Sequence, residues 1–183
     1  DAAGNAGDAV NDTITFDYEA PGAPTLISPD DGAYTNDPWP DFSYSQPTAD
    51  TNWYRFELDD NSGFSSPYIG NTSDEMFSPT TQTEGTYFWR VKARDAAGNW
   101  GSFSSYRTIH IDTTAPTGAS ISINGGASYA TSTSVTLSLS ASGASQMRFQ
   151  NESNGGWSGY ESYSTSKSWT LSNSQGTRTV YVQ

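Results

Sequence analysis

Hydrophobic and polar residues alternate with a period of two along most of the chain, which is the pattern of β-strands with one buried face. Residues 85–93 show it most clearly, because Tyr87, Trp89 and Val91 share one face and charged side chains occupy much of the other. Residues 53–59 alternate in the same way. We find no convincing window with the 3.6-residue period of an amphipathic helix. The pattern therefore predicts an all-β protein with antiparallel strands.

The alternation also predicts which side chains form the core. Within residues 53–59, Tyr54, Phe56 and Leu58 point inward, whereas Glu57 points outward. The predicted core is built on aromatic residues at inward strand positions, namely Tyr44, Phe56, Tyr87, Trp89 and Trp169.

Two sequence signals recur at nearly constant spacing. Asp-Ala-Ala-Gly-Asn stands at residues 1–5 and again at residues 95–99, and a strand-like segment ending in Ala-Pro stands at residues 14–21 and again at 109–116. A period near 94 residues suits one β-sandwich per repeat. We therefore expect tandem antiparallel β-sandwiches joined end to end by short Ala-Pro linkers. The expected parts are the last turn and strand of a preceding sandwich (1–18), a complete sandwich (19–112) and a sandwich lacking its final strand (113–183).

The charge of the chain excludes some partners. The net charge is −12, and all but two of the 20 acidic residues precede residue 113. An acidic surface repels phosphate backbones, so we expect no nucleic-acid binding. No apolar run approaches the roughly 20 residues that span a bilayer, so we expect no membrane insertion in this segment. The absence of cysteine excludes disulfides and thiol chemistry.

Several motifs resemble known repeat families. The Tyr-x-Trp-x-Val-x-Ala run at 87–93, followed by Asp-x-x-Gly-Asn, is similar to the penultimate strand and turn of fibronectin type III domains, with Tyr87 at their tyrosine-corner position. Residues 112–116, Asp-Thr-Thr-Ala-Pro, open a second repeat that resembles bacterial immunoglobulin-like modules, as do residues 147–149, 157–161 and 167–171. The resemblance implies a tandem-repeat protein of a prokaryotic cell surface, in an extracellular setting.

The resemblance also implies a metal site. In related adhesin repeats, aspartates in such turns and linkers bind calcium between domains, and oxygen ligands suit this hard cation. The candidate ligands are the acidic and amide residues of the two repeated motifs: Asp95, Asn99, Asp112, Asp1, Asn5 and Asp17. Alternatively, Asp95 and Asn99 only cap their turn through backbone hydrogen bonds.

Other candidate chemistry is weaker. His110 is the only histidine, which gives little support to a zinc site or a catalytic triad, and no pair of carboxylates stands out for glycoside hydrolysis. We therefore expect no catalytic residues and no enzyme. The sequons at Asn11, Asn71 and Asn151 are candidate glycosylation sites. Four tryptophans outside the predicted core either cover loops or stack on sugars, namely Trp39, Trp53, Trp100 and Trp157.

Two classes of function remain open. The first is a structural repeat protein that spaces or links surface components, as a stalk, adhesin shaft, sheath or filament subunit. The alternative is an ancillary carbohydrate-binding or spacer module of a secreted polysaccharide-degrading enzyme, with surface glycans as partners. In either case residues 7–17 carry the strand that the second repeat lacks. We expect this segment to complete the second-repeat sandwich of a neighbouring copy, or of an adjacent repeat in a longer array.

Overall fold

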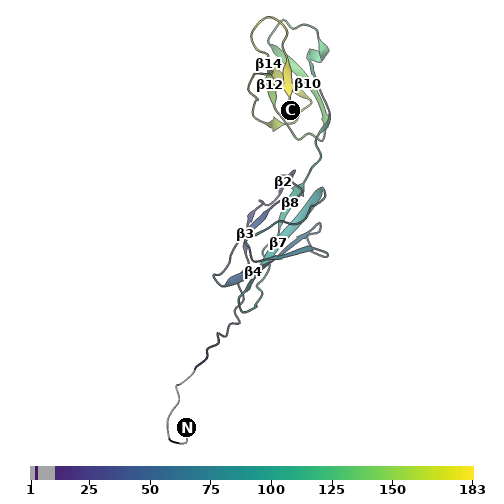
Figure 1. Cartoon of the computed structure of the whole chain (residues 1–183). Helices are drawn as coiled ribbons and strands as arrows, with labels where there is room; N and C mark the ends of the chain where they lie inside the picture. Colours follow the sequence, from purple (N-terminus) through teal and green to yellow (C-terminus); the bar gives the residue numbers. More distant parts are fainter. Residues whose placement is uncertain (1–2, 4–10) are drawn as a thin grey trace. The chain divides into compact units, whose positions relative to one another are not determined.

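In a computed structural model, the chain forms two compact units, Asp1–Thr113 and Thr114–Gln183 (Figure 1). The structure describes residue 3 and residues 11–183. The predicted ligands Asp1 and Asn5, and the first part of the predicted strand at 7–17, lie outside the described residues. Both units are built from β-strands, as the alternating pattern predicts, and the second also contains one short 3-10 helix, η1 (Asn124–Gly126).

The described residues of unit 1 form two β-sheets. The three-stranded sheet has the order β1-β3-β6, from β1 (Thr25–Ser28), β3 (Phe42–Ser45) and β6 (Met76–Phe77). The five-stranded sheet has the order β2-β8-β7-β4-β5, from β2 (Ala33–Thr35), β8 (Arg107–Ile111), β7 (Gly85–Asp95), β4 (Thr51–Asp59) and β5 (Tyr68–Thr72). All pairs are antiparallel except β2 with β8, which is parallel.

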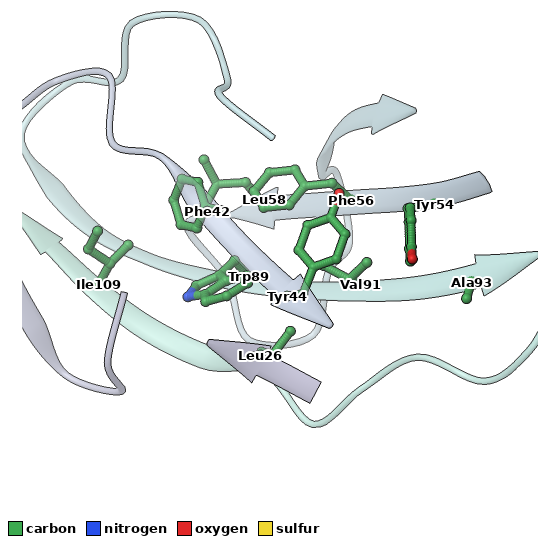
Figure 2. Packing of buried hydrophobic residues seen from close by; sticks show 10 residues of the cluster. All are labelled: Leu26, Phe42, Tyr44, Tyr54, Phe56, Leu58, Trp89, Val91, Ala93 and Ile109. Carbon is green, nitrogen blue, oxygen red and sulfur yellow. The ribbon is translucent and has the colours of Figure 1, made fainter. Parts of the chain in front are cut away.

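The core of unit 1 lies between its two sheets. Trp89 of β7 and Phe56 of β4 are fully buried and face Phe42 and Tyr44 of β3 (Figure 2). The rings of Phe42 and Trp89 meet edge to face, with centroids 4.9 Å apart, in the geometry that aromatic quadrupoles favour. Burial raises the pKa of the Tyr44 hydroxyl, and neighbouring Tyr54, among other groups, raises it further.

Tyr87 fixes the entry into β7. Its ring is partly buried against the core, and its hydroxyl donates a 3.1 Å hydrogen bond to the carbonyl oxygen of Thr83. A bond from this hydroxyl to a backbone group a few residues upstream is the tyrosine-corner arrangement. The chain before β7 is thereby tied to the strand that carries Trp89.

Unit 2 has three small sheets. They have the orders β14-β10-β9, β11-β13 and β12-β15. The strands are β9 (Thr117–Ile123), β10 (Ser134–Ser142), β11 (Gln146–Met147), β12 (Phe149–Asn151), β13 (Glu161–Ser162), β14 (Ser166–Thr170) and β15 (Val180–Val182). The predicted core residue Trp169 is partly buried: its ring packs 5.2 Å from that of Phe149, and its Nε1–H donates to Asn151 Oδ1.

Two features of the structure do not follow from the alternating pattern. Glu57 is only 2% exposed, although it points away from the core, because Arg90 and the aromatic side chains around it cover that face of the sheet. Residues 11–17, the described part of the predicted strand at 7–17, form no strand in the single chain. A strand requires a neighbour for its N–H and C=O groups, and no described strand of this chain pairs with this segment.

Candidate functional site

The turn after β7 is organised by the carboxylate of Asp95, which is 1% exposed. Its Oδ1 accepts hydrogen bonds from the backbone N–H groups of Gly98 at 2.7 Å and Asn99 at 2.8 Å. Its Oδ2 accepts one from the side-chain amide of Asn99 at 2.9 Å. Gly98 has φ +100°, a conformation that side-chain-bearing residues rarely adopt. The predicted turn-capping role of Asp95 and Asn99 is therefore present in the geometry.

These hydrogen bonds set the charge state of Asp95. Burial by itself raises the pKa of the carboxyl, but the bonds from the Asn99 side chain and from the backbone of Asn99, Gly98 and Ala97 outweigh it and hold the pKa below its ordinary value. The ionised form is thus preferred in the folded state.

An acid titration tests this arrangement. A carboxyl whose pKa is lowered by folding contributes stability above its unfolded pKa, and this contribution disappears as the pH falls through the folded pKa. We therefore expect Asp95→Asn to be less stable than the native chain at neutral pH, and the difference to shrink as the pH falls below about 4. Urea unfolding at a series of pH values measures it. A difference independent of pH would contradict the role of the charge.

Asp95 belongs to a cluster with Asp17 and Asp50, in which one carboxylate oxygen of each residue lies within 4.8 Å of one oxygen of each of the others. Asn99 also contacts this group, because its side-chain amide lies 3.3 Å from the Asp17 carbonyl oxygen. Asp17 and Asp50 line a surface depression together with Glu19. Like charges at this separation repel, and a hard cation with oxygen ligands relieves that repulsion. The arrangement is chemically suited to calcium.

The structure divides the predicted ligand set. Asp17, Asp95 and Asn99 come together. Asp112 does not join them, because it lies at the opposite end of β7 from Asp95. It follows Ile111 of β8, which pairs with the first residue of β7, whereas Asp95 is the last residue of β7. Its backbone N–H donates to the Thr35 carbonyl oxygen instead. The repeat is still informative, since Asp17 precedes the first strand of unit 1 as Asp112 precedes the first strand of unit 2.

Asp50 is a further member of the cluster that was not among the predicted ligands. It immediately precedes β4, and the first residue of that strand, Thr51, lies opposite Asp95 in the pairing with β7. The backbone N–H of Ala96 donates to the carbonyl oxygen of Asp50, which fixes the two turns side by side. The register of β4 on β7 is the signal that could have found it, but the sequence alone does not provide that register.

The close approach of the linker holds Asp17 near the turn. A Cβ atom added to Gly101 would lie 2.2 Å from the backbone carbonyl oxygen of Pro21, so only glycine fits at this contact. Pro21 is itself buried. The segment that carries Asp17 is therefore packed against the chain that follows the Asp95 turn.

A calcium titration tests the cluster. At a tenfold excess over the dissociation constant, calcium should raise the melting temperature of unit 1 by about 5–8 °C, and a chelator should reverse the shift. Asp50→Asn should abolish the shift, because it removes one of the three carboxylates of the cluster. The variant should leave the Asp95 turn intact, since Asp50 is exposed and its side chain makes none of the hydrogen bonds to Asp95. Asp112→Asn is the matched control and should retain it. An unchanged melting temperature in the native chain would leave only the capping role.

Cationic side chains of β7 stack on aromatic rings on the outer face of the large sheet. Arg90 lies 3.9 Å from the Phe64 ring centroid and 4.0 Å from that of Phe103. Further along β7, two of the outward tryptophans make the same kind of contact. Lys92 lies over the ring of Trp100, and Arg94 lies near the rings of both Trp100 and Trp53. These rings cover the sheet, which matches the loop-covering alternative.

The other two outward tryptophans are more accessible. Trp39 is 54% exposed. Trp157 is 41% exposed and lies with Tyr160 around the guanidinium of Arg148, at centroid distances of 4.9 and 4.6 Å. They are the described tryptophans with the largest exposed fractions, and therefore the candidates for contact with a sugar ring.

The sequons differ in accessibility. The side chains of Asn11 and Asn71 are exposed. The Asn151 amide donates to the Thr170 carbonyl oxygen, and its oxygen accepts from the Trp169 indole. These two bonds hold the Asn151 amide against unit 2, where its nitrogen is less accessible to a glycan than the exposed amides of Asn11 and Asn71. His110 stacks on Tyr34 with centroids 4.4 Å apart, and its Nδ1 lies 2.8 Å from the Thr86 hydroxyl.

The chain was compared with known proteins by sequence and by structure. No protein-family model and no curated sequence matches it. Fibronectin(III)-like modules of Clostridium thermocellum CbhA superpose with a TM-score of 0.55 at 16% identity, over 87% of this chain and 83% of theirs. The protein has a fibronectin type III-like fold.

Two weaker structural similarities involve enzymes. The α-L-rhamnosidases of Dictyoglumus thermophilum and Streptomyces avermitilis give TM-scores of 0.41 and 0.46, at 12% and 16% identity. The matches cover 73% and 71% of this chain but only 17% and 15% of those enzymes. They add nothing to the assignment of the fibronectin type III-like fold. Within the described part of the chain, no helix is long and apolar enough to cross a membrane.

Proposed function

We propose that this chain is a structural spacer of an extracellular or cell-surface protein, built to carry tension between the components that it links. The observation that carries the proposal is the parallel pairing of β2 with β8, the last strand of unit 1. Ala33 lies opposite Ile109, and Thr35 lies opposite Ile111. A pull on the two ends of unit 1 draws these strands in opposite directions along their length.

Additional bonds strengthen this connection. The backbone N–H of Gly32 donates to the Thr108 carbonyl oxygen at 2.8 Å, and that of Thr108 donates to Asp31 Oδ1 at 2.7 Å. The guanidinium of Arg107 donates to the carbonyl oxygens of Ile27 at 2.9 Å and Pro29 at 2.7 Å. The segment from β1 to β2 is thus bonded to β8 by both backbone and side-chain groups.

The direction of loading gives these bonds their mechanical role. When two strands are pulled along their length, all the hydrogen bonds between them are loaded together, whereas strands peeled apart from one end lose their bonds one at a time. Each bond is weak by itself, about 1 kcal/mol net. Simultaneous loading therefore gives a large barrier to forced unfolding, which depends on the unfolding rate and not on equilibrium stability alone.

Other features support a spacer. The acidic, lysine-poor composition keeps such a surface solvated, and the fibronectin type III-like fold is consistent with an accessory or spacer module. The alternative, an ancillary carbohydrate-binding module, is favoured by one observation: Trp39 and Trp157 leave ring surface exposed. On either function, a calcium ion at the Asp17–Asp50–Asp95 cluster would stiffen the segment that enters unit 1.

Single-molecule stretching tests the mechanical proposal. Unit 1 should unfold in one step that lengthens the chain by roughly 250 Å. Asp31→Ala should lower the unfolding force, because it removes the side-chain acceptor for Thr108 in the β2–β8 connection. The control is Thr72→Ala, which removes a comparable acceptor for the Asp74 N–H outside this connection. Equal forces for the two variants would contradict the proposal.

A further inference from the structure

The outer face of the five-stranded sheet of unit 1 is basic, although the chain has a net charge of −12. Four of the five basic residues of unit 1 occupy outward positions of β4 and β7, namely Arg55, Arg90, Lys92 and Arg94. The acidic residues at outward positions of this sheet are Glu57 and Asp59, which are 2% and 6% exposed. Trp53, Trp100 and Phe103 lie among the cations. We call this surface the basic face.

Two of the four cations have no carboxylate partner. Arg55 and Arg90 share Glu57. Lys92 and Arg94 form no ion pair with any described residue, although unit 1 contains 18 acidic residues. The Nε atom of Arg94 is in addition buried without a hydrogen-bond partner among the described residues. An aromatic ring attracts a cation less strongly than a carboxylate does, so these two side chains retain the capacity to bind a carboxylate of a partner.

The opposite sheet of unit 1 carries the opposite charge. Phe42 of β3 points into the core, so alternation places Asp41 on the outer side. Asp74 lies two residues before Met76, which points outward and is 51% exposed. Both aspartates are exposed, and no basic residue lies on β3 or β6 or within four residues of them in the sequence. We call the surface formed by Asp41, Asp74 and Met76 the acidic face.

We propose that the basic face of one copy of this chain binds the acidic face of a second copy, with Lys92 and Arg94 against the carboxylates of Asp41 and Asp74. The partner is a second copy because the chain itself carries both of the complementary surfaces. Tryptophan and arginine, which build the basic face, are enriched at the centres of interfaces. The repulsion between two acidic chains is screened beyond about 8 Å at about 0.15 M salt, whereas charges in direct contact still attract.

The apolar side chains and the positions of the two faces fit this pairing. Trp100 is 37% exposed on the basic face and Met76 is 51% exposed on the acidic face, so each leaves apolar surface for the other to cover. The two faces belong to different sheets and lie on opposite sides of the core. The contact is therefore heterologous, and each copy can bind one neighbour through each face. This self-association goes beyond the spacer function and is independent of it.

Light scattering after size exclusion in about 0.15 M salt tests the pairing. The native chain should form species whose masses are multiples of 19.7 kDa, increasingly so at higher concentration. Lys92→Glu/Arg94→Glu should give monomers, and so should Asp41→Lys/Asp74→Lys, with circular dichroism showing that both variants are folded. An equimolar mixture of the two variants should associate again, because each reversed face then meets the opposite charge. A native chain that stays at 19.7 kDa at high micromolar concentration, or a mixture that stays monomeric, would overturn the proposal.

Zero-length cross-linking with a carbodiimide, which joins an amine to a carboxylate in contact with it, tests the contact without reversed charges. The chain contains two lysines, Lys92 and Lys167. Dimers of the native chain should contain Lys92 joined to Asp41 or Asp74, as identified by mass spectrometry. Lys92→Gln should lose these dimers, whereas Lys167→Gln is the matched control and should retain them. Equal yields of dimer from the two variants would contradict the contact. Failure of either test would leave the force measurement, and with it the spacer function, unaffected.

Discussion

Replacing Trp89 with alanine is expected to lower the free energy of unfolding of unit 1 by about 3–5 kcal/mol, the range for large aromatic deletions in a core. Trp89 is fully buried, and its ring lies 4.9 Å from that of Phe42 and 6.2 Å from that of Phe56. The two sheets cannot collapse into the resulting cavity without moving β3. Chemical denaturation followed by far-ultraviolet circular dichroism measures the change.

Two further variants show whether burial is the cause. Trp39→Ala removes a side chain that is 54% exposed and should change the free energy by less than about 1 kcal/mol. Trp89→Phe keeps a ring in the core and removes an indole N–H that has no hydrogen-bond partner in the structure, so it should lose much less than Trp89→Ala. A loss below about 1 kcal/mol for Trp89→Ala would mean that β7 is out of register with this description.

Replacing Glu57 with alanine is expected to lower the free energy of unfolding by about 3 kcal/mol, since it leaves two arginines without their common partner. The Glu57 carboxylate is bonded by Arg55 and Arg90, with closest N–O distances of 2.7 Å to each. The arginine side chains are 34% and 28% exposed, so solvent screens part of their charge. The expected loss therefore lies at the lower end of the range of about 3–5 kcal/mol for a broken buried ion pair.

The matched control is an ion pair of similar length on the surface of unit 2. Glu161 and Lys167 lie 2.6 Å apart with exposed fractions of 36% and 32%, and Glu161→Ala should change the free energy by about 0–1 kcal/mol. Urea unfolding at low and high salt separates the two cases, because the loss for Glu161→Ala should be the more sensitive of the two to salt. Equal losses for the two variants would show that Glu57 is not energetically buried.

The contrast between Trp89 and Glu57 shows what a linear sequence provides. The inward face of β7 follows from alternation, since period-two patterning places Trp89 toward the core whatever the rest of the chain does. The burial of Glu57 depends on Phe64 and Phe103, which stack on Arg90 from distant loops. Alternation cannot predict that a second layer of side chains covers the outer face.

The candidate metal site shows the same limit. The repeated motif identified Asp95, Asn99 and Asp17, because a repeat marks positions with a common environment. Asp50 is not part of a repeated motif, and only the pairing of β4 with β7 places it in the cluster. Asp112 shares the motif of Asp17 but lies at the other end of β7 from Asp95. A motif indicates which residues play equivalent roles, whereas strand register decides which of them meet.

As a structural spacer, this chain would link other parts and would not itself recognise a sugar. The most direct test is binding of the native chain to an array of plant, bacterial and animal glycans, with Trp39→Ala and Trp157→Ala as companions. A spacer predicts no saturable binding, and no difference between the native chain and either variant. Saturable binding of the native chain to one class of glycan, lost in Trp39→Ala or in Trp157→Ala, would contradict the claim and establish the carbohydrate-binding alternative.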